Sequence, residues 1–394
     1  MPQRTPLAKW HENNRGRMVD FAGWSMPVQY SSIVSEHLGT RNGAGVFDVS
    51  HMGRVAIEGS QAAEWLESRL TRQVRDLPVG RARYTLITGV DDTGGKVQLD
   101  GTPVILDDAL VTRLADQKDG TQRFILVVNA SNRQRVVRWL EACLPPEGVT
   151  ISDITEESAM IAVQGPGVFG HKKDDVHEGP LRCVFEESIL EQLAALPNYG
   201  ALETQLGGEP VLVSRTGYTG EDGVEIILKS SQAQGVWEEL VEEGGAIPCG
   251  LGSRDTLRLE AAMPLYGHEL HEKTDPFSAG LGFAVNIDGR DFPGVEEIRT
   301  RRGESDRRRV GLVFESRRAA RSGDQVMFSK NGMDSVCGEI TSGSFSPTCE
   351  RGIALAVVDR VVLEQECELE VLVRGVRLPA KIVSLPFYRR PRHD

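Results

Sequence analysis

From about Val310 onward the chain is a series of short segments in which apolar and polar residues alternate. Alternation with a period of two places the apolar side chains on one face of a strand, and short turns let neighbouring strands bury those faces together. The pattern predicts an antiparallel β-barrel or sandwich at the C-terminus. The preceding stretch EIRTRRGESDRRR is Arg-rich and is expected to be an interdomain linker or an exposed helix end. The alternating segments are RRVGLVFES, DQVMFSK, VCGEITSG, IALAVVD, ECELEVLVRG and RLPAKIVS.

The part of the chain before Val310 mixes strand-like and helix-like segments, which predicts an α+β fold. A chain of 394 residues is too long for one ordinary core and indicates two or three domains. Helices are expected at 31–41, at AAEWLESRL and at 232–243. Another is expected after the strand RFILVV, where Val136, Val137 and Leu140 have helical spacing and the polar NASN provides a cap.

Charge and cysteine content exclude several classes of function. The net charge of −12 argues against a nucleic-acid partner, because phosphate neutralisation needs a basic surface. No apolar run approaches the ~20 residues of a membrane span, and the N-terminus has no apolar signal segment. The six widely spaced cysteines form no CxxC pair and favour reduced thiols in the cytoplasm. HELHE at 268–272 lacks the HExxH spacing, so no metal site is expected.

Two adjacent carboxylates, Asp107 and Asp108, interrupt the segment VILDDALV, which otherwise has the composition of a buried strand. Strands are depleted in Asp, and a buried carboxylate costs several kcal/mol unless it is paired or hydrogen-bonded. Two interpretations are open on these residues alone. The pair is either a turn between apolar residues or an acid held in a functional site.

The segment SRTGYTGEDGVEI predicts a hairpin whose second strand contains Glu225. If the face that carries Glu225 is buried, its carboxylate needs a donor. The ring N–H and exocyclic NH₂ of a pterin or a guanine would suit it as a bidentate partner. Glu221 and Asp222 fall in the turn and are expected to be exposed.

The segment CGLGSRDTLRLEAAMPLYG predicts a glycine-rich turn and then a helix that Ser253 caps. Arg254 and Arg258 are four residues apart and share a face of that helix. They form either a solvated face, with Asp255 favoured near the helix N-terminus, or a site for an anion, which the planar guanidinium fork matches.

Two motifs resemble known sites but fail on context. MIAVQGPGVFG has the spacing GxGxxG, yet no amphipathic helix follows it, so a tight turn is expected instead of a dinucleotide loop. Asp48, Ser50 and His51 in FDVSHMGR contain the residue types of a catalytic triad, but no nucleophile-elbow sequence surrounds Ser50. A structural turn is expected there, with Met52 in a pocket wall.

Taken together, long collinear blocks resemble one family closely, the T protein of the glycine cleavage system, which is a tetrahydrofolate-dependent aminomethyltransferase. The match covers nearly the whole chain. The blocks that carry it are RTPL, MVDFAGWSMPVQY, FDVSHMG, VVNASNR, AVQGP, RTGYTGEDGVEI, GLGSRDTLRLEAAMPLYG, EITSGSFSPT and PFYRR.

The resemblance implies a three-domain, ring-like fold with folate in a central channel and a C-terminal antiparallel β-barrel. We expect a first folate-binding domain at 1–50 and 140–280, a second at 51–139 that carries the catalytic aspartate, and the barrel with its linker at 281–394. The family's catalytic aspartate lies in a GGxxDDLxV segment, which matches LDDALV here and favours Asp108, with Asp107 beside it. The resemblance further implies folate-site roles for Tyr84, Asn129, Tyr218, Glu225, Arg254, Met52 and Tyr388.

The implied reaction moves a one-carbon unit from the aminomethylated lipoyl arm of the H protein to tetrahydrofolate, with release of ammonia and formation of 5,10-methylenetetrahydrofolate. A fixed carboxylate in a water-poor cavity would stabilise the positive charge that develops. The expected partners are folate and H protein, with no nucleic acid and no membrane.

The sequence departs from the family pattern at one place. The family has two residues between the Gly-Gly and the Asp-Asp, whereas here KVQLDGTPVIL follows Gly95. The insertion either lengthens a β-hairpin, with LDGTPV as its turn, and leaves the acid in place, or displaces Asp108.

Two alternatives belong to relatives of the same architecture. One is a folate-dependent demethylase of a small methylated amine or sulfonium compound. The other is a non-transferase relative that assists iron–sulfur cluster assembly or tRNA modification. That relative carries a KGCxxGQE-type block, where this chain reads LEAAMPLYGHEL.

Overall fold

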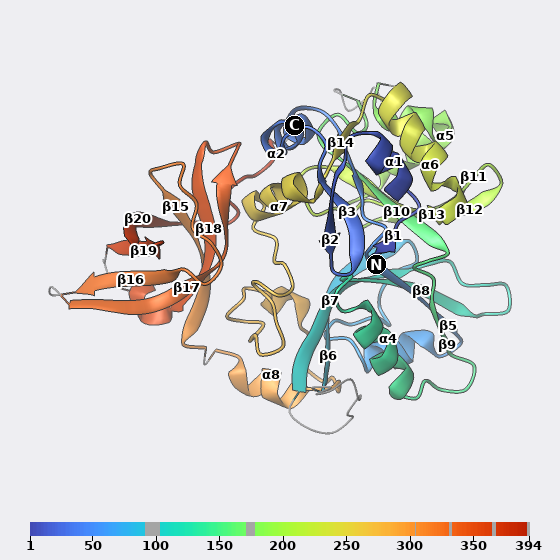
Figure 1. Cartoon of the computed structure of the whole chain (residues 1–394). Helices are drawn as coiled ribbons and strands as arrows, with labels where there is room; N and C mark the ends of the chain where they lie inside the picture. The colour runs from blue at the N-terminus through green and yellow to red at the C-terminus, as the bar shows by residue number, and fades with distance from the viewer. Residues whose placement is uncertain (91–102, 171–177, 304, 331–332, 365–367, 392–394) are drawn as a thin grey trace.

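The computed structural model describes the chain except for residues 91–102, 171–177, 304, 331–332, 365–367 and 392–394. Figure 1 shows the N-terminal two thirds of the chain as a body of sheets and helices, with the C-terminal strands as a separate body beside it. The segment between them contains the helix α8 (Val295–Arg301), which includes the start of the predicted Arg-rich linker. The predicted α+β class with a C-terminal barrel is confirmed.

One part of the body is a six-stranded sheet with helices packed against it. Its hydrophobic core joins residues of the central strands to the helices, as with Ile161, Ile226 and Trp237. A small sheet, β1 (Gln3–Arg4), β3 (Trp24–Gln29) and β2 (Arg17–Phe21), lies beside it. The strand order of the large sheet is β11 (Ala201–Leu206), β12 (Glu209–Ser214), β13 (Gly223–Lys229), β10 (Ser158–Gln164), β4 (Gly45–Asp48) and β14 (Ile247–Cys249). The helices of this part are α1 (Ala8–Asn13), α2 (Ile33–Asn42), α5 (Glu187–Ala195), α6 (Ala233–Glu238) and α7 (Leu251–Glu260).

The other part of the body is a five-stranded sheet whose buried face packs on α3 (Ala62–Glu67) and α4 (Arg133–Ala142). The apolar spacing in α4 places Val136, Trp139 and Leu140 in the core, while Val137 is only partly buried. The domain boundaries given above stay a prediction. The strand order is β6 (Arg81–Val90), β7 (Pro103–Arg113), β8 (Gln122–Val128), β5 (Gly53–Gly59) and β9 (Thr150–Asp153).

The six alternating segments at the C-terminus form a closed antiparallel barrel, as predicted. Alternate residues such as Val310, Leu312 and Phe314 fill its interior, because successive side chains of a strand point to opposite faces. Closure leaves no free sheet edge. The order around the barrel is β15 (Arg307–Phe314), β18 (Arg351–Asp359), β17 (Met333–Ser346), β16 (Gln325–Lys330), β19 (Leu369–Val373) and β20 (Val376–Val383).

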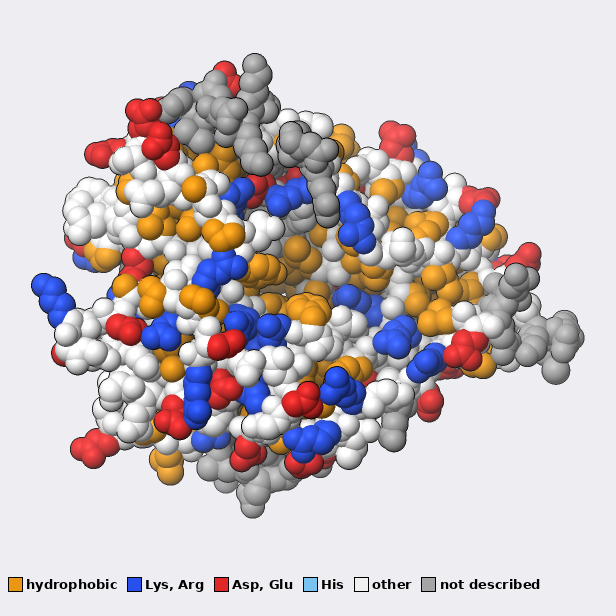
Figure 2. All heavy atoms as spheres, turned by 180° about the vertical axis from the view of Figure 1, so that it is seen from behind, with side chains coloured by type: hydrophobic (Ala, Val, Ile, Leu, Met, Phe, Trp, Pro, Cys, Tyr) orange, Lys and Arg blue, Asp and Glu red, His pale blue; other side chains and the backbone are white. Residues whose placement is uncertain are grey.

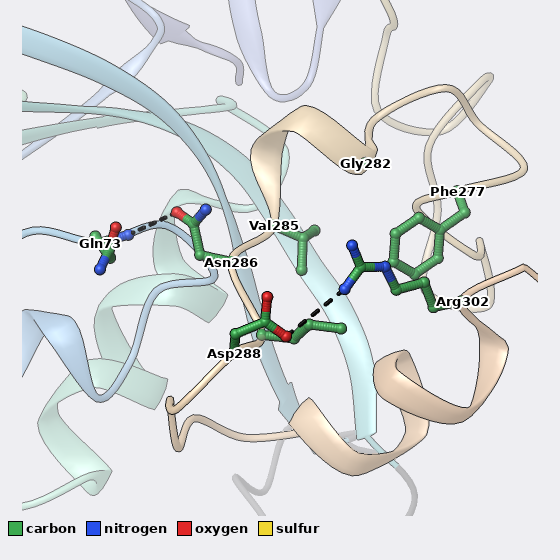
Figure 3. Close-up of a pocket in the computed structure, with 8 residues that line it drawn as sticks. Gln73, Phe277, Gly282, Val285, Asn286, Asp288 and Arg302 are labelled. Carbon is green, nitrogen blue, oxygen red and sulfur yellow. Dashed lines mark hydrogen bonds and ion pairs between the residues drawn. The ribbon is translucent and has the colours of Figure 1, made fainter.

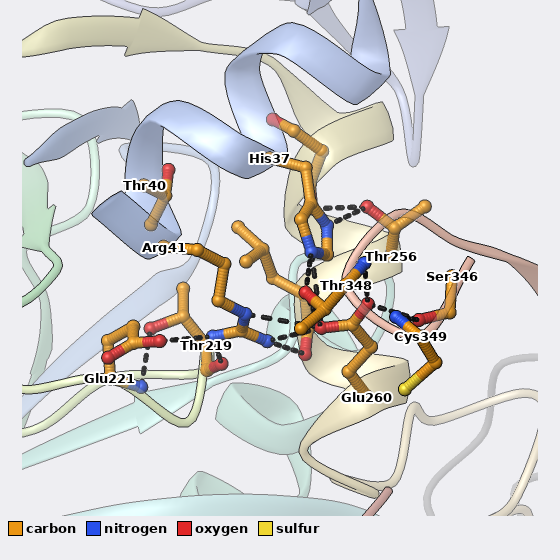
Figure 4. Close-up of polar contacts among 12 residues, drawn as sticks. His37, Thr40, Arg41, Thr219, Glu221, Thr256, Glu260, Ser346, Thr348 and Cys349 are labelled. Carbon is orange, nitrogen blue, oxygen red and sulfur yellow. Dashed lines mark hydrogen bonds and ion pairs between the residues drawn. The ribbon is translucent and has the colours of Figure 1, made fainter. Parts of the chain in front are cut away.

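A buried polar cluster joins the barrel to the body, and Figure 4 shows it around the carboxylate of Glu260 at the end of α7. From α2, His37 Nε2 lies 3.1 Å and Arg41 Nη2 lies 2.9 Å from Glu260 Oε2. From the barrel side, Thr348 donates to the same oxygen at 2.8 Å, and the hydroxyl of Ser346 donates to Oε1 at 2.5 Å. One carboxylate therefore connects two helices of the body to the barrel.

Two expectations for the turn acids and the helix cap are wrong. Glu221 is not exposed: its side chain is 2% accessible, because Oε1 pairs with Arg41 Nη1 at 2.8 Å. Asp222 is largely covered and accepts a hydrogen bond from Arg215 Nε at 3.0 Å. Gly250, and not Ser253, is the N-cap of α7; the hydroxyl of Ser253 donates back to the carbonyl of Gly250.

The rejected motifs are structural, as expected. Gly165 has φ +135°, and a Cβ there would lie 2.2 Å from the carbonyl oxygen of Gly43, so a close turn explains this glycine. Asp48 accepts hydrogen bonds from Thr5 and His11, while the hydroxyl of Ser50 donates to a backbone carbonyl. No triad forms. No helix among the described residues is long and apolar enough to cross a membrane.

Candidate functional site

Asp107 and Asp108 lie inside β7, next to a β-bulge. Ile87 of β6 pairs with Asp107 while Thr88 pairs with Ile105, so β7 carries one extra residue, Leu106. A bulge bends the strand and re-aims the neighbouring side chains. Both carboxylates thereby reach the same amide, although adjacent strand residues normally point to opposite faces. The interpretation of the pair as a turn is wrong.

Asn129, which follows β8 directly, holds the two carboxylates together. Its side-chain Nδ2 lies 2.8 Å from Asp107 Oδ1 and 2.8 Å from Asp108 Oδ1, and its backbone N–H donates to Asp107 Oδ2 at 2.8 Å. Asn132 Nδ2 adds a bond of 2.7 Å to Asp107 Oδ1. The hydroxyl of Tyr84, from β6, donates to Asp108 Oδ2 at 3.0 Å. Asn132 was expected only to cap α4, but its side chain makes no cap hydrogen bond and binds the acid.

All the hydrogen-bond donors to this pair are neutral, and among the described residues neither carboxylate forms an ion pair. Burial and the charge of Asp108 raise the pKa of Asp107 well above its usual range, against the hydrogen bonds from Asn132 and Asn129. Burial also raises the pKa of Asp108, although Tyr84 and Asn129 donate to it. Asp107 is fully buried and has three donors, whereas Asp108 is partly accessible. Asp108 is therefore the carboxylate that a ligand can reach.

Tyr218 and Arg254 form a second wall near the acid. The guanidinium carbon of Arg254 lies 5.0 Å from the centre of the Tyr218 ring, and the ring hydroxyl donates to the carbonyl of Pro264. Burial raises the pKa of Tyr218, and the charge of Asp108 acts in the same direction, which places the two groups within electrostatic reach. Arg254 Nη1 is buried and has no hydrogen-bond partner among the described residues.

Glu225 lies on β13 and is 5% accessible, so its face is buried, as its possible role requires. Thr216 donates to its Oε2 at 2.5 Å. The other oxygen, Oε1, accepts no hydrogen bond from any residue that the structure describes. Burial lowers the pKa of Arg254, while the charge of Glu225 opposes this shift, so these two groups also lie in one electrostatic neighbourhood.

Arg258 does not belong to a solvated face, and its side chain is engaged by other residues. Its side chain is 2% accessible, and its Nη1 pairs with the buried carboxylate of Glu269 at 2.9 Å. Its Nη2 donates to Ser342 of the barrel. Of the two arginines on one face of α7, Arg254 is therefore the one that keeps a free donor.

The remaining two predicted residues, Met52 and Tyr388, make no hydrogen bond or ring contact with the acid among the described residues. Met52 is partly buried against the hydrophobic cluster that contains Val127 and Leu257. Tyr388 stacks on Arg41, with the guanidinium carbon 3.9 Å from the ring centre, and its backbone N–H donates to the backbone carbonyl of Glu260. It thus adjoins two residues of the barrel-to-body cluster, and no described contact joins it to Asp108.

The acid lies within strand β7, beside its bulge, and β7 pairs with β6. Residues 103–106 extend β7, which pairs with β6 along its length. The expected turn LDGTPV falls largely on residues outside the described part of the chain. Asp108 is nevertheless in contact with Tyr84 and Asn129, the residues that the resemblance implied.

Comparison with known proteins decides the family. The GCVT N-terminal domain matches residues 7–289, and the glycine cleavage T-protein C-terminal barrel domain matches residues 307–389. The chain belongs to the glycine cleavage T-protein family. These matches confirm the predicted family and enzyme class, a tetrahydrofolate-dependent aminomethyltransferase, and do not favour the demethylase alternative.

Full-length relatives agree with this membership. The aminomethyltransferase of Symbiobacterium thermophilum is 40% identical over 99% of this chain and 98% of its own. That of Rubrobacter xylanophilus is 41% identical over 100% of this chain and 96% of its own. The crystal structure of the glycine cleavage system aminomethyltransferase T from Bartonella henselae has 30% identity, covers 99% of both chains and has a TM-score of 0.83.

The molecule has a hollow on one face, and a separate cavity lies close to Phe283, which stacks on Tyr84. Figure 2 shows a hollow on one face, with hydrophobic side chains inside it and Lys and Arg side chains around it. A separate cavity of about 300 Å³ lies in the segment after α7, and Figure 3 shows its ion pair between Asp288 and Arg302. Neighbouring Phe283 is 62% accessible and stacks on Tyr84 at 5.8 Å between ring centres. The cavity is lined by Gln73, Phe277, Gly282, Val285, Asn286, Ile287, Asp288 and Arg302.

Proposed function

We propose that this chain transfers the aminomethyl carbon from a lipoyl-bearing H protein to tetrahydrofolate, and that Asp108 is the catalytic carboxylate. The observation that carries the proposal is the partly accessible Asp108, held by the neutral donors Tyr84 and Asn129 without a counter-ion. A carboxylate without a fixed cation keeps its charge available for a cation that forms during the reaction.

The residues around the acid divide its work. Asn129 donates to both carboxylates, and Asn132 donates to Asp107. Asp107 thereby holds the Asn129 amide in place, and that amide restricts rotation of the Asp108 side chain. Tyr84 orients the second oxygen of Asp108. Positioned groups of this kind make the charge stabilisation effective because little reorganisation is needed as the reaction proceeds.

The polar groups of the second wall fit a reduced folate. Glu225 offers a free carboxylate oxygen, which suits the N–H and NH₂ edge of a pterin. Arg254 offers a buried Nη1 without a partner, which suits an acceptor oxygen such as a carboxylate of the glutamyl tail. A buried donor without a partner costs about 1–3 kcal/mol, so these groups favour a bound ligand. Tyr218 and Met52 would contribute apolar surface.

Tetrahydrofolate, when bound, supplies the nitrogens that take up the carbon. Asp108 then stabilises positive charge on the carbon as it leaves sulfur, and its carboxylate can hold or accept a proton from the accepting nitrogen. The raised pKa of Asp108 makes its carboxylate a stronger base for that proton. Tyr388 lies in the barrel-to-body cluster, so its role is to position that interface.

Two measurements test the proposal. Tetrahydrofolate binding is measured by calorimetry, and ammonia release is followed with aminomethylated H protein as the donor. Binding with ammonia release supports the transferase. Binding without ammonia release would favour the demethylase reaction, and absence of folate binding would favour a scaffold role.

Glu225→Gln tests whether the Glu225 carboxylate binds the pterin edge of tetrahydrofolate. We expect tetrahydrofolate to bind about tenfold more weakly, because one charge-assisted hydrogen bond is lost. Glu203→Gln, on strand β11 two positions away in the same sheet, is a matched control, since Glu203 pairs with Arg123. Equal affinity in the Glu225 variant would contradict its assignment.

A further inference from the structure

Arg309 is a cation of the barrel that none of the site assignments above uses. It lies on β15, and its backbone N–H donates to the carbonyl of Ser278 at 2.8 Å. Its side-chain Nη1 is buried and has no hydrogen-bond partner among the described residues. A buried, always-charged donor without an acceptor is costly, so an isolated structural role does not explain it.

The neighbours of this guanidinium are the residues of the candidate site. Burial lowers the pKa of Arg309, while Glu269, Tyr84 and Tyr218 act in the opposite direction. Tyr84 and Tyr218 are also the two tyrosines that interact with Asp108. Packing places Arg309 there as well: a Cβ at Gly280 would lie 3.5 Å from Arg309 Nη2. Gly280 stands between Ala279 and Leu281, which belong to the buried cluster that packs on Tyr84. Arg309 therefore approaches Tyr84 from the barrel side.

No described residue accepts a hydrogen bond from Nη1 of Arg309. The nearby carboxylate of Glu269 is engaged elsewhere: its Oε2 accepts from Arg258 and from the backbone of Leu265, and its Oε1 accepts from Thr341. The hydroxyls of Tyr84 and Tyr218 donate to other groups, and neither accepts a hydrogen bond from Arg309. An acceptor for this donor therefore comes from solvent or from a ligand.

We infer that Arg309 completes the folate site from the barrel by donating to an acceptor oxygen of bound tetrahydrofolate, an inference that rests on the proposed function. The acceptor is a carboxylate of the glutamyl tail or a carbonyl of the ring or amide; either is an oxygen that a guanidinium binds well. The barrel then contributes a direct ligand contact, which the sequence had assigned to Tyr388.

The test is the affinity of Arg309→Met for tetrahydrofolate, measured by calorimetry without H protein. We expect the dissociation constant to rise about tenfold or more, because a charge-assisted hydrogen bond is lost. Arg307→Met is the matched control: it lies on the same strand with its side chain 45% accessible and should bind like the wild type. Tetrahydropteroate, which lacks the glutamate, identifies the acceptor. A penalty that disappears with this ligand indicates the carboxylate, and a penalty that persists indicates a carbonyl.

Each outcome separates the two proposals. If the wild type does not bind tetrahydrofolate, the proposed function fails, and this inference with it. If the wild type binds and Arg309→Met binds equally well, only the role of Arg309 is overturned. Far-UV circular dichroism and the melting temperature check folding. Should the Met variant not fold, Arg309→Lys is measured instead, and a several-fold loss of affinity is expected because Lys lacks the planar fork; unchanged affinity overturns the inference.

Discussion

Two buried carboxylate centres in this molecule have opposite electrostatics. Burial tends to raise the pKa of Glu260, but the hydrogen bond and charge of His37, together with Ser346 and Arg41, lower it to about 2. At Asp107 and Asp108, burial is opposed only by neutral donors, and both pKa values are raised. The chemical group is the same, and the neighbours decide the direction of the shift.

The difference separates a structural acid from the acid to which we assign the reaction. Glu260, at the end of α7, is saturated by groups from α2 and from the barrel side, so its charge holds these elements together. The charge of Asp108 has no cationic partner among the described residues. Burial of this charge destabilises the folded protein and leaves the carboxylate able to bind a cation or a proton. Variants that remove each charge should therefore affect different properties.

The largest expected effect is on turnover in Asp108→Asn. Asn keeps the shape and can still accept from Asn129, while its amide can donate to the Tyr84 oxygen, but it carries no charge. We expect kcat to fall by roughly 10²–10⁴, with the tetrahydrofolate dissociation constant nearly unchanged. Steady-state ammonia release and calorimetry provide the two values.

Asp116→Asn is the control for this variant, because Asp116 is accessible and pairs with Arg113 at the far end of β7. Wild-type turnover in Asp108→Asn would contradict the catalytic assignment. A large fall in Asp107→Asn alone would transfer that role to Asp107.

Glu260→Gln should have the next largest effect, and on stability. Removing the charge takes the buried carboxylate partner from His37 and one of two from Arg41, which keeps Glu221; breaking such buried pairs costs about 3–5 kcal/mol of the free energy of unfolding. Urea unfolding at pH 7 measures this loss. Glu64→Gln, whose side chain is 70% accessible, should change stability by less than about 1 kcal/mol. Equal stability of the two variants would show that the cluster does not hold the barrel to the body.

The sequence predicted the barrel well because its signal is local: alternation and turns are visible segment by segment. It also identified Asp108, Asn129 and Tyr84 through the resemblance, and all three meet in the structure. It missed Asn132, which a capping pattern explained equally well, and Arg309, which sits among exposed arginines of a linker-like stretch. It placed Glu221 in solvent, because no local pattern shows that Arg41, 180 positions away, pairs with it. Contacts between distant segments determine these roles.

The smallest expected effect is on how stability varies with pH. The pKa of Asp108 is higher in the folded state than in the unfolded chain, so the folded state binds more protons between these two values. Wild-type stability therefore falls as pH rises through that window, and Asp108→Asn, which has no such proton, should be at least as stable as wild type at pH 7. The difference in stability between Asp108→Asn and the wild type should shrink as pH falls toward the pKa of an Asp in the unfolded chain.

Glu260 changes the free energy of unfolding with pH in the opposite direction. Its pKa is lowered to about 2, so its contribution is present above the unfolded pKa and is lost as pH falls from about 4.5 through about 2. Urea midpoints of wild type and the two variants between pH 3.5 and 8 test both slopes. If Asp108→Asn is clearly less stable than wild type at pH 7, the Asp108 carboxylate stabilises the fold. The contrast between the paired carboxylate of Glu260 and the unpaired one of Asp108 then fails.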